Sequence, residues 1–266
     1  MTTATTKSLT STDGTPLTIE ETGSGTPLVL LHGGATTTRV WDGLLPAVAG
    51  RYRCLAVGRR GYGQSGDSPA HSFQREAEDV AAVLATLDEP AHLFGHSSGA
   101  IVAATAALTD PDRLRSLLLY EPPFPIGQPH PDAWVSNAEE AIGRGATEEG
   151  LLIGMRDGIG FPPAVIDRFR GDPGWPARVA VAPAWIREAR SVVSLAPGVD
   201  HFAALDLPTM LLHGALTEAH HTAAIHALAK VLPRGEITEL PGQGHTAVLL
   251  APDLVAAAIL PFLDRH

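Results

Sequence analysis

The chain has 266 residues, and its 19 lysines and arginines against 29 aspartates and glutamates give a formal net charge of −10. This balance argues against nucleic acids and anionic membrane surfaces as main partners. The single cysteine, Cys54, excludes an intrachain disulfide and a cysteine-cluster metal site, and we expect it in the core. With 18% charged and 44% hydrophobic residues, the composition is that of a globular protein. The length fits one large domain or one domain with an insertion.

The sequence shows no targeting pattern. Its first eight residues are polar and contain no apolar run, unlike a secretory signal peptide. No segment approaches the roughly 18 consecutive apolar residues of a membrane span. We therefore expect a cytoplasmic protein without membrane contact.

Hydrophobic patterning predicts alternating strands and helices on both sides of a long interruption. Short apolar runs that end in glycine, such as 27–32, are typical of strands buried on both faces. The predicted elements are, in chain order, a hairpin at 7–21, a strand at 27–32, a helix at 38–48, strands at 53–57 and 91–94 around a helix at 72–88, a helix at 99–108, a strand at 117–120, a strand at 209–212, a helix at 219–231, a strand at 236–240 and a helix at 252–264. This repetition predicts an α/β fold with a doubly wound, mostly parallel sheet.

The interruption spans residues 122–203. It holds 11 of the 22 prolines and three of the four tryptophans, and helical patches occur at 132–144, 147–157 and 177–194. No strand pattern is evident there. The segment is therefore predicted as a helical insertion at one end of the sheet, whose aromatic side chains form a small core of their own or line a substrate cleft.

The motif Gly95-His96-Ser97-Ser98-Gly99 has the form G-x-S-x-G. Alone the pattern is weak, but an apolar strand precedes it and a small-residue helix follows it. That context is typical of a serine nucleophile on a strained strand-to-helix turn, whereas the alternative is an ordinary glycine–serine turn. Ser97 is the candidate nucleophile, at a helix N-terminus whose dipole favours developing negative charge.

Two further motifs stand where acyl transfer would need them. His32-Gly33-Gly34 ends an early strand, and a turn there can aim the Gly34 N–H at an oxyanion, with the Ser98 N–H as second donor. Gly244-His245 follows the last predicted strand. His245 is therefore the candidate general base for Ser97.

These motifs, with Gly61-Tyr62-Gly63-Gln64-Ser65 between them, make the chain resemble the α/β-hydrolase family over nearly its whole length. The resemblance implies an eight-stranded sheet and a helical cap between the sixth and seventh strands. It also implies a nucleophile, an acid and a histidine in that chain order. The core domain would then comprise 1–121 and 204–266, and the cap would comprise 122–203.

The acid departs from the family pattern. The family usually places it after the seventh strand, where this chain has Thr217. Glu121, at the end of the sixth strand, and Glu218 are the two candidates, with no acid at all as a third reading. We favour Glu121, because Pro122 and Pro123 fix the backbone beyond it and some family members carry their acid there.

Other residues have simpler expectations. Gly58 stands where relatives have an aspartate, so Arg59 and Arg60 are expected to lack a partner and to be solvated. His32 and His96 flank turns and are expected to hold loops in place.

A metal site is not expected. His213, His220 and His221 are histidines close together in the sequence. However, His220 and His221 are adjacent on a predicted helix and point about 100° apart, so they do not share one face.

The combined features predict a serine hydrolase without cofactor, acting on an ester, lactone or thioester of a small, mostly apolar molecule through an acyl-enzyme. Carbon–carbon hydrolases, amidases and acyltransferases use the same residues. A non-hydrolytic member of the fold, such as a ligand receptor or a cofactor-free cyclase, is the alternative. The sequence says nothing about oligomeric state.

Overall fold

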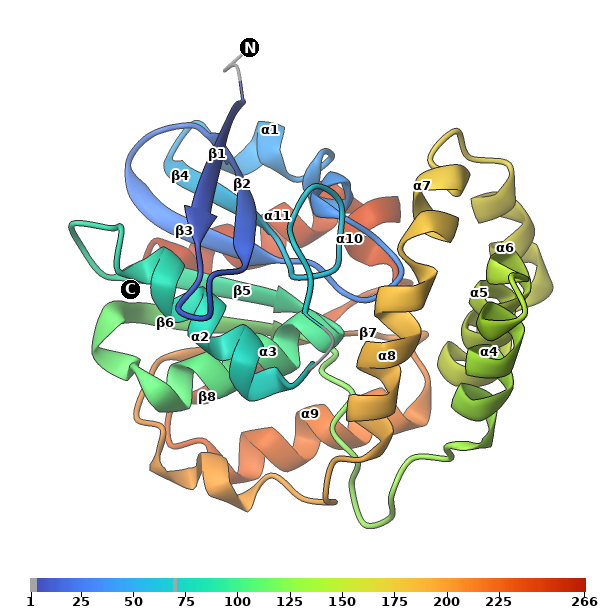
Figure 1. Cartoon of the computed structure of the whole chain (residues 1–266). Helices are drawn as coiled ribbons and strands as arrows, with labels where there is room; N and C mark the ends of the chain where they lie inside the picture. Colours follow the sequence, from blue (N-terminus) through green and yellow to red (C-terminus); the bar gives the residue numbers. More distant parts are fainter. Residues whose placement is uncertain (1–3, 69–70) are drawn as a thin grey trace.

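The computed structural model describes residues 4–68 and 71–266, which form an eight-stranded sheet flanked by helices (Figure 1). The strand order is β1-β2-β4-β3-β5-β6-β7-β8, and β2 pairs antiparallel with β1 and β4 while the other pairs are parallel. The strands are β1 Thr5–Thr10, β2 Pro16–Thr22, β3 Thr26–Leu31, β4 Tyr52–Gly58, β5 Ala91–His96, β6 Leu114–Tyr120, β7 Thr209–Gly214 and β8 Gly235–Leu240. The doubly wound, mostly parallel sheet predicted from the sequence is confirmed.

The central strands are apolar on both faces because helices cover both faces of the sheet. Successive side chains of a strand point to opposite sides, so the strand residues divide between two cores. In β3, for example, Val29 and Leu31 pack in one core while Leu28 and Leu30 pack in the other. Cys54 of β4 is fully buried in the second core, as expected.

Helices α2 (Phe73–Leu84), α3 (Ser98–Thr109) and α9 (Ala219–Val231) cover one face of the sheet. Helices α1 (Leu45–Val48), α10 (Ala247–Leu250) and α11 (Pro252–Leu263) cover the other face. Helix α3 consists largely of alanine and other small residues, which allows it to lie close to β5 and β6 beneath α2. The nucleophile turn at its start is therefore held by a rigid layer.

Five helices follow one another between β6 and β7 and lie apart from the sheet (Figure 1). They are α4 Ala133–Gly143, α5 Thr147–Ile153, α6 Pro163–Arg170, α7 Trp175–Ala180 and α8 Ala182–Val193. They share an apolar cluster built around Trp185, Met155 and Phe169. Phe124 and Phe202 lie near the ends of the same insertion but pack in the core beneath the sheet.

Two predicted helices are interrupted in the structure. Residues 38–48 form a 3₁₀ turn, Thr38–Trp41, and the short α1, because Pro46 at the start of α1 cannot continue a preceding helix. Residues 177–194 divide into α7 and α8 with a break at Val181, beside Pro183 near the start of α8. Periodicity alone does not show these breaks.

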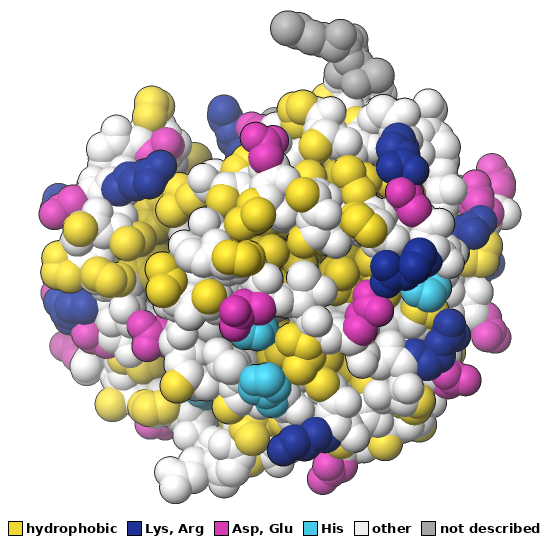
Figure 2. All heavy atoms as spheres, turned by 180° about the vertical axis from the view of Figure 1, so that it is seen from behind, with side chains coloured by type: hydrophobic (Ala, Val, Ile, Leu, Met, Phe, Trp, Pro, Cys, Tyr) yellow, Lys and Arg dark blue, Asp and Glu magenta, His cyan; other side chains and the backbone are white. Residues whose placement is uncertain are grey.

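Charged side chains lie mainly toward the edges of the face opposite to the view of Figure 1, and hydrophobic side chains occupy its middle (Figure 2). Leu249 and Leu250 of α10 are among the large hydrophobic side chains that remain exposed. Among the described residues, no helix combines the length and the apolarity needed to span a membrane.

Candidate active site

Ser97 occupies a sharp turn between β5 and α3. Its backbone has φ 55° and ψ −126°, and its N–H donates to the Tyr120 carbonyl over 2.8 Å. The turn requires glycine on both sides: a Cβ on Gly95 would lie 2.4 Å from the Gly99 carbonyl oxygen, and a Cβ on Gly99 would lie 2.4 Å from that of His32. The G-x-S-x-G spacing therefore reflects close backbone contact around an exposed nucleophile.

Backbone strain is concentrated at this place. Among the described residues, the non-glycine residues with positive φ are Ala35 (53°), Ser97 (55°) and Glu121 (49°). Each such residue costs on the order of 1–3 kcal/mol, and such residues cluster at functional sites. The three follow β3, β5 and β6, whose carboxyl ends meet at one edge of the sheet. This edge is therefore the candidate active site.

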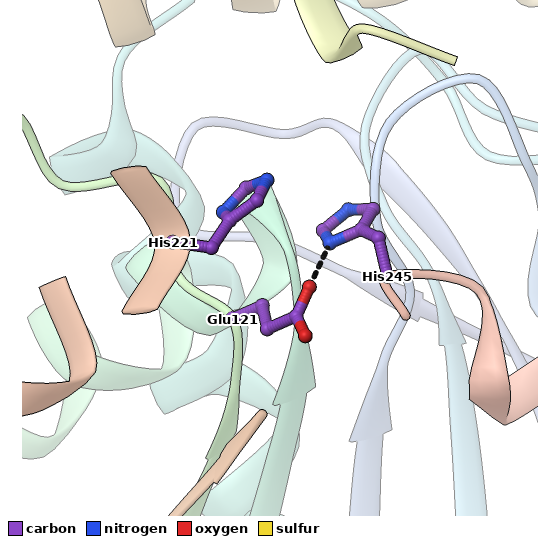
Figure 3. Close-up of side chains that lie close together, drawn as sticks. All are labelled: Glu121, His221 and His245. Carbon is purple, nitrogen blue, oxygen red and sulfur yellow. Dashed lines mark hydrogen bonds and ion pairs between the residues drawn. The ribbon is translucent and has the colours of Figure 1, made fainter. Parts of the chain in front are cut away.

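A carboxylate–imidazole pair faces this edge (Figure 3). Nδ1 of His245 donates to Oε2 of Glu121 over 2.6 Å, and the Glu121 side chain is fully buried. The Gly214 N–H donates to Oε1 over 2.8 Å, and the Thr217 hydroxyl donates to Oε2 over 2.8 Å. Because Nδ1 carries the proton, Nε2 of His245 is the nitrogen left to accept one.

Glu121 is held as a carboxylate despite its burial. Burial by itself would raise its pKa, but the hydrogen bonds from His245, Gly214 and Thr217 and the attraction of His245 outweigh it and lower the pKa below its ordinary value. A negative charge is thus kept beneath the histidine, where it stabilises an imidazolium.

The His245 loop is fixed from both sides. Nε2 of His96 donates to the His245 carbonyl over 2.8 Å, which confirms the expected loop-holding role of His96. The Tyr120 hydroxyl donates to the neighbouring carbonyl of Gly244. The His221 ring stacks on His245 at 4.5 Å between centroids and 13° between planes. Burial, followed by the nearby His245, lowers the pKa of His221 well below its ordinary value, so this ring is neutral.

Glu121, His221 and His245 place one potential ligand atom each within 4.8 Å of one another (Figure 3). Their geometry does not suit a metal ion. The Nδ1 of His245 is occupied by its proton and by Glu121, and two stacked rings do not direct nitrogens to a common point. The arrangement is that of a hydrogen-bonded catalytic pair with an aromatic neighbour.

Ser97 and His245 line one cavity of about 440 Å³ between the sheet edge and the helices α4–α8. No hydrogen bond joins their side chains within the described part of the chain. Most of the lining is apolar, and it includes the aromatic and aliphatic residues Trp134, Met155, Ile159, Phe161, Phe169, Trp185, Val192 and Val193. The cavity has the size of a small-molecule site.

The two expected oxyanion donors border the same cavity. Ser98 is the first residue of α3, so its N–H has no acceptor within the helix. Gly34 lies under Trp185, whose ring would be 2.1 Å from a Cβ at that position. Only glycine therefore allows the loop after β3 to pass beneath α8.

Arg59 and Arg60 are not solvated, contrary to expectation; both are at most 2% exposed. The Arg59 guanidinium makes two bonds of 2.7 Å to Glu76 and lies 3.2 Å from Glu188 of α8. It also donates to the His32 carbonyl over 3.0 Å, and the Arg59 N–H donates to the His32 ring, so His32 holds this loop as expected. A buried ion-pair network therefore links the helical insertion to the loops around Ser97.

Arg60 has its own buried partners. It bonds to both Asp79 oxygens at 2.6 and 2.7 Å and to Asp13 at 3.0 Å. The carboxylates come from α2 and from the first hairpin, not from position 58.

The remaining candidates lie at the periphery. Glu218 is exposed where α9 begins and shows no contact with His245. Thr217 lies at the usual acid position and hydrogen-bonds to Glu121. His220 lines the cavity rim, and His213 lies on β7 with its ring bonded to the Gly214 carbonyl over 3.2 Å.

The chain matches the alpha/beta hydrolase family over residues 28–258. An alpha/beta hydrolase from Sphaerobacter thermophilus superposes with a TM-score of 0.87 at 29% identity, covering 97% of this chain and all of the other. A pimeloyl-[acyl-carrier protein] methyl ester esterase from Aeromonas hydrophila is 43% identical over 68 residues, which are 25% of this chain and 27% of that esterase. A 2-(acetamidomethylene)succinate hydrolase from Mesorhizobium japonicum is 26% identical over 93% of this chain and 91% of its own.

Proposed function

The chain belongs to the alpha/beta hydrolase family, and we propose that it is a serine hydrolase that cleaves an ester, lactone or thioester bond. The observation that carries the proposal is the Glu121–His245 pair at the same sheet edge as the strained Ser97. The similarity to a methyl ester esterase supports it, although the aligned segment spans only about a quarter of that relative.

The proposed reaction begins when Ser97 Oγ attacks the substrate carbonyl while Nε2 of His245 takes its proton. The Gly34 and Ser98 N–H groups stabilise the oxyanion, and Glu121 stabilises the imidazolium. His245 then returns the proton to the leaving alcohol or thiol, which leaves an acyl-enzyme on Ser97. Water, deprotonated by His245, attacks the acyl group and releases the acid. Every proton is carried by His245, so this sequence of steps uses no cofactor.

We further propose that residues 122–203 act as a lid over a core formed by 1–121 and 204–266. The helices α4–α8 supply most of the apolar lining of the cavity, while the core supplies Ser97, Glu121 and His245. A site built in this way suits a small and mostly apolar substrate, because apolar side chains gain free energy by covering apolar ligand surface.

A fluorophosphonate probe tests the central assignment. It should label the wild-type protein and should not label Ser97→Ala. Ser8→Ala, on the exposed strand β1, is the matched control and should be labelled like the wild type. Wild-type protein that is folded and remains unlabelled would refute the hydrolase proposal and favour the ligand-binding or cyclase alternative.

A further inference from the structure

The cavity lining contains one lysine or arginine among the described residues, Arg178 of α7. Its Nη1 donates to the Ala35 carbonyl over 2.5 Å. The guanidinium lies over the Phe169 ring at 4.4 Å from the centroid. These two contacts fix the side chain at the cavity wall and use only one of its five N–H donors.

Arg178 differs from the other buried arginines in having no carboxylate partner. Within the described residues, Arg59 and Arg60 form ion pairs, and the pKa of each is raised by its acidic partners against the opposing effect of burial. No ion pair is formed by Arg178. Burial lowers its pKa from the ordinary value, and the more distant Asp172 opposes this only weakly.

The acidic residues of the cavity do not neutralise this charge. Asp157 is paired with its neighbour Arg156, with the two bonds at 2.6 and 2.7 Å. Glu188 is buried against Arg59 and accepts a hydrogen bond from Tyr62. Glu218 is exposed at the rim. The cavity therefore presents one uncompensated positive charge in an otherwise apolar wall, and such a charge is stabilised by an anionic ligand.

The position of Arg178 relates this charge to the proposed chemistry. Ala35 directly follows Gly34, a proposed oxyanion donor, and two residues span at most about 7 Å. The leaving group must lie near His245, which protonates it, whereas Arg178 contacts the loop after β3. An anion bound by Arg178 would thus lie on the acyl side of the substrate, a few carbon atoms from the reacting carbonyl.

We propose that Arg178 binds a carboxylate on the acyl chain, so that the preferred substrates are monoesters of short dicarboxylic acids. The inference rests on the proposed hydrolase function and adds a substrate class to it. The guanidinium offers a planar pair of donors that matches a carboxylate. The apolar wall around it accommodates the methylene groups between the two carbonyl carbons.

The test compares monoethyl glutarate with ethyl pentanoate, which is of similar length but neutral, by titrating the released acid. The wild type should favour monoethyl glutarate in kcat/KM. Arg178→Met should lower that preference about 10- to 100-fold, mainly through KM, since a charge-assisted hydrogen bond contributes about 1.4–2.7 kcal/mol. Arg168→Met, on the exposed side of α6, is the matched control and should keep the preference. Loss of the Ala35 contact affects both esters alike, so the ratio isolates the carboxylate.

Binding to inactive protein separates this inference from the hydrolase proposal. Ser97→Ala should bind monoethyl glutarate in calorimetric titration, and Ser97→Ala/Arg178→Met should bind it at least tenfold more weakly. If the wild type hydrolyses neither ester while this difference in binding persists, the hydrolase proposal fails and the anion site stands. An unchanged substrate preference in Arg178→Met, or equal binding by the two inactive variants, would overturn the anion site.

Discussion

Replacing Glu121 by glutamine changes almost nothing in shape and reverses the direction of one hydrogen bond. The glutamine oxygen can still accept from the Gly214 N–H, at the 2.8 Å position now held by Oε1. Its amide NH₂ then takes the place of Oε2, 2.6 Å from Nδ1 of His245. A donor at this position forces Nδ1 to become the acceptor, so the imidazole proton moves to Nε2. The nitrogen that should take the Ser97 proton is then already protonated.

The expected loss follows from this change of tautomer. In serine hydrolases with a well-characterised triad, the equivalent carboxylate-to-amide change lowers kcat by about 10⁴-fold, or about 5.5 kcal/mol in activation free energy. We expect Glu121→Gln to lose on the order of 10³- to 10⁴-fold in turnover of a p-nitrophenyl ester. Its fluorophosphonate labelling should slow in parallel.

Glu218→Gln is the control, because Glu218 is exposed and shows no contact with His245. It should keep its turnover within a few-fold of the wild type. Retention of more than a tenth of the activity by Glu121→Gln would refute the acid assignment. A comparable loss in Glu218→Gln would transfer the role to that residue.

A double variant sharpens the reasoning. The Thr217 hydroxyl lies 2.8 Å from the Glu121 oxygen that binds His245, so an aspartate at 217 would bring a carboxylate to the same place. Adding Thr217→Asp to Glu121→Gln should recover at least tenfold in turnover. No recovery in a folded protein would show that a carboxylate entering from position 217 does not reach His245.

Three further outcomes concern stability. Gly99→Ala should lower the free energy of unfolding in urea by about 2–4 kcal/mol, because the new Cβ would meet backbone carbonyls at 2.4–2.5 Å; a loss below about 1 kcal/mol would contradict this. Glu188→Ala should cost about 3 kcal/mol by removing one buried partner of Arg59, and a neutral result would show that Glu76 alone satisfies the charge. Burial lowers the pKa of His96 to about 3 and that of His92 to about 4, so below pH 6.5 the unfolded chain binds protons that the folded chain does not. Stability should therefore fall by about 1.4 kcal/mol per pH unit for each histidine as the pH drops from 6.5 to 4, and constant stability over that range would refute the buried neutral state.

The sheet and the nucleophile turn could be predicted because their signals are local. A buried parallel strand shows as a short apolar run, and the turn at Ser97 needs small residues at fixed spacing. Glu121 was also accessible, since it ends a predicted strand. The interruption of the helix predicted at 38–48 was visible only as Pro46, which is tolerated in the first turn of a helix and so does not by itself mark a break.

The partners of Arg59 could not be predicted because they are distant in the sequence. Glu76 is 17 residues away and Glu188 is 129 residues away, on separate helices. The same reason hides the stacking of His221 on His245 and the place of Arg178 in the cavity wall. Histidines or arginines on a helix carry no local signal that distinguishes a solvated side chain from a buried one.

The change in acid position follows from strand pairing. Tyr120 of β6 lies opposite Leu212 of β7, and the Glu121 N–H donates to the Leu212 carbonyl over 3.1 Å. Neighbouring strands lie about 4.8 Å apart, a distance that a glutamate side chain can span. Its carboxylate therefore reaches the loop after β7, where Gly214 and Thr217 bind it. Because His245 responds to where the negative charge lies and not to which strand carries it, a glutamate after β6 with a threonine after β7 can serve in place of an aspartate after β7.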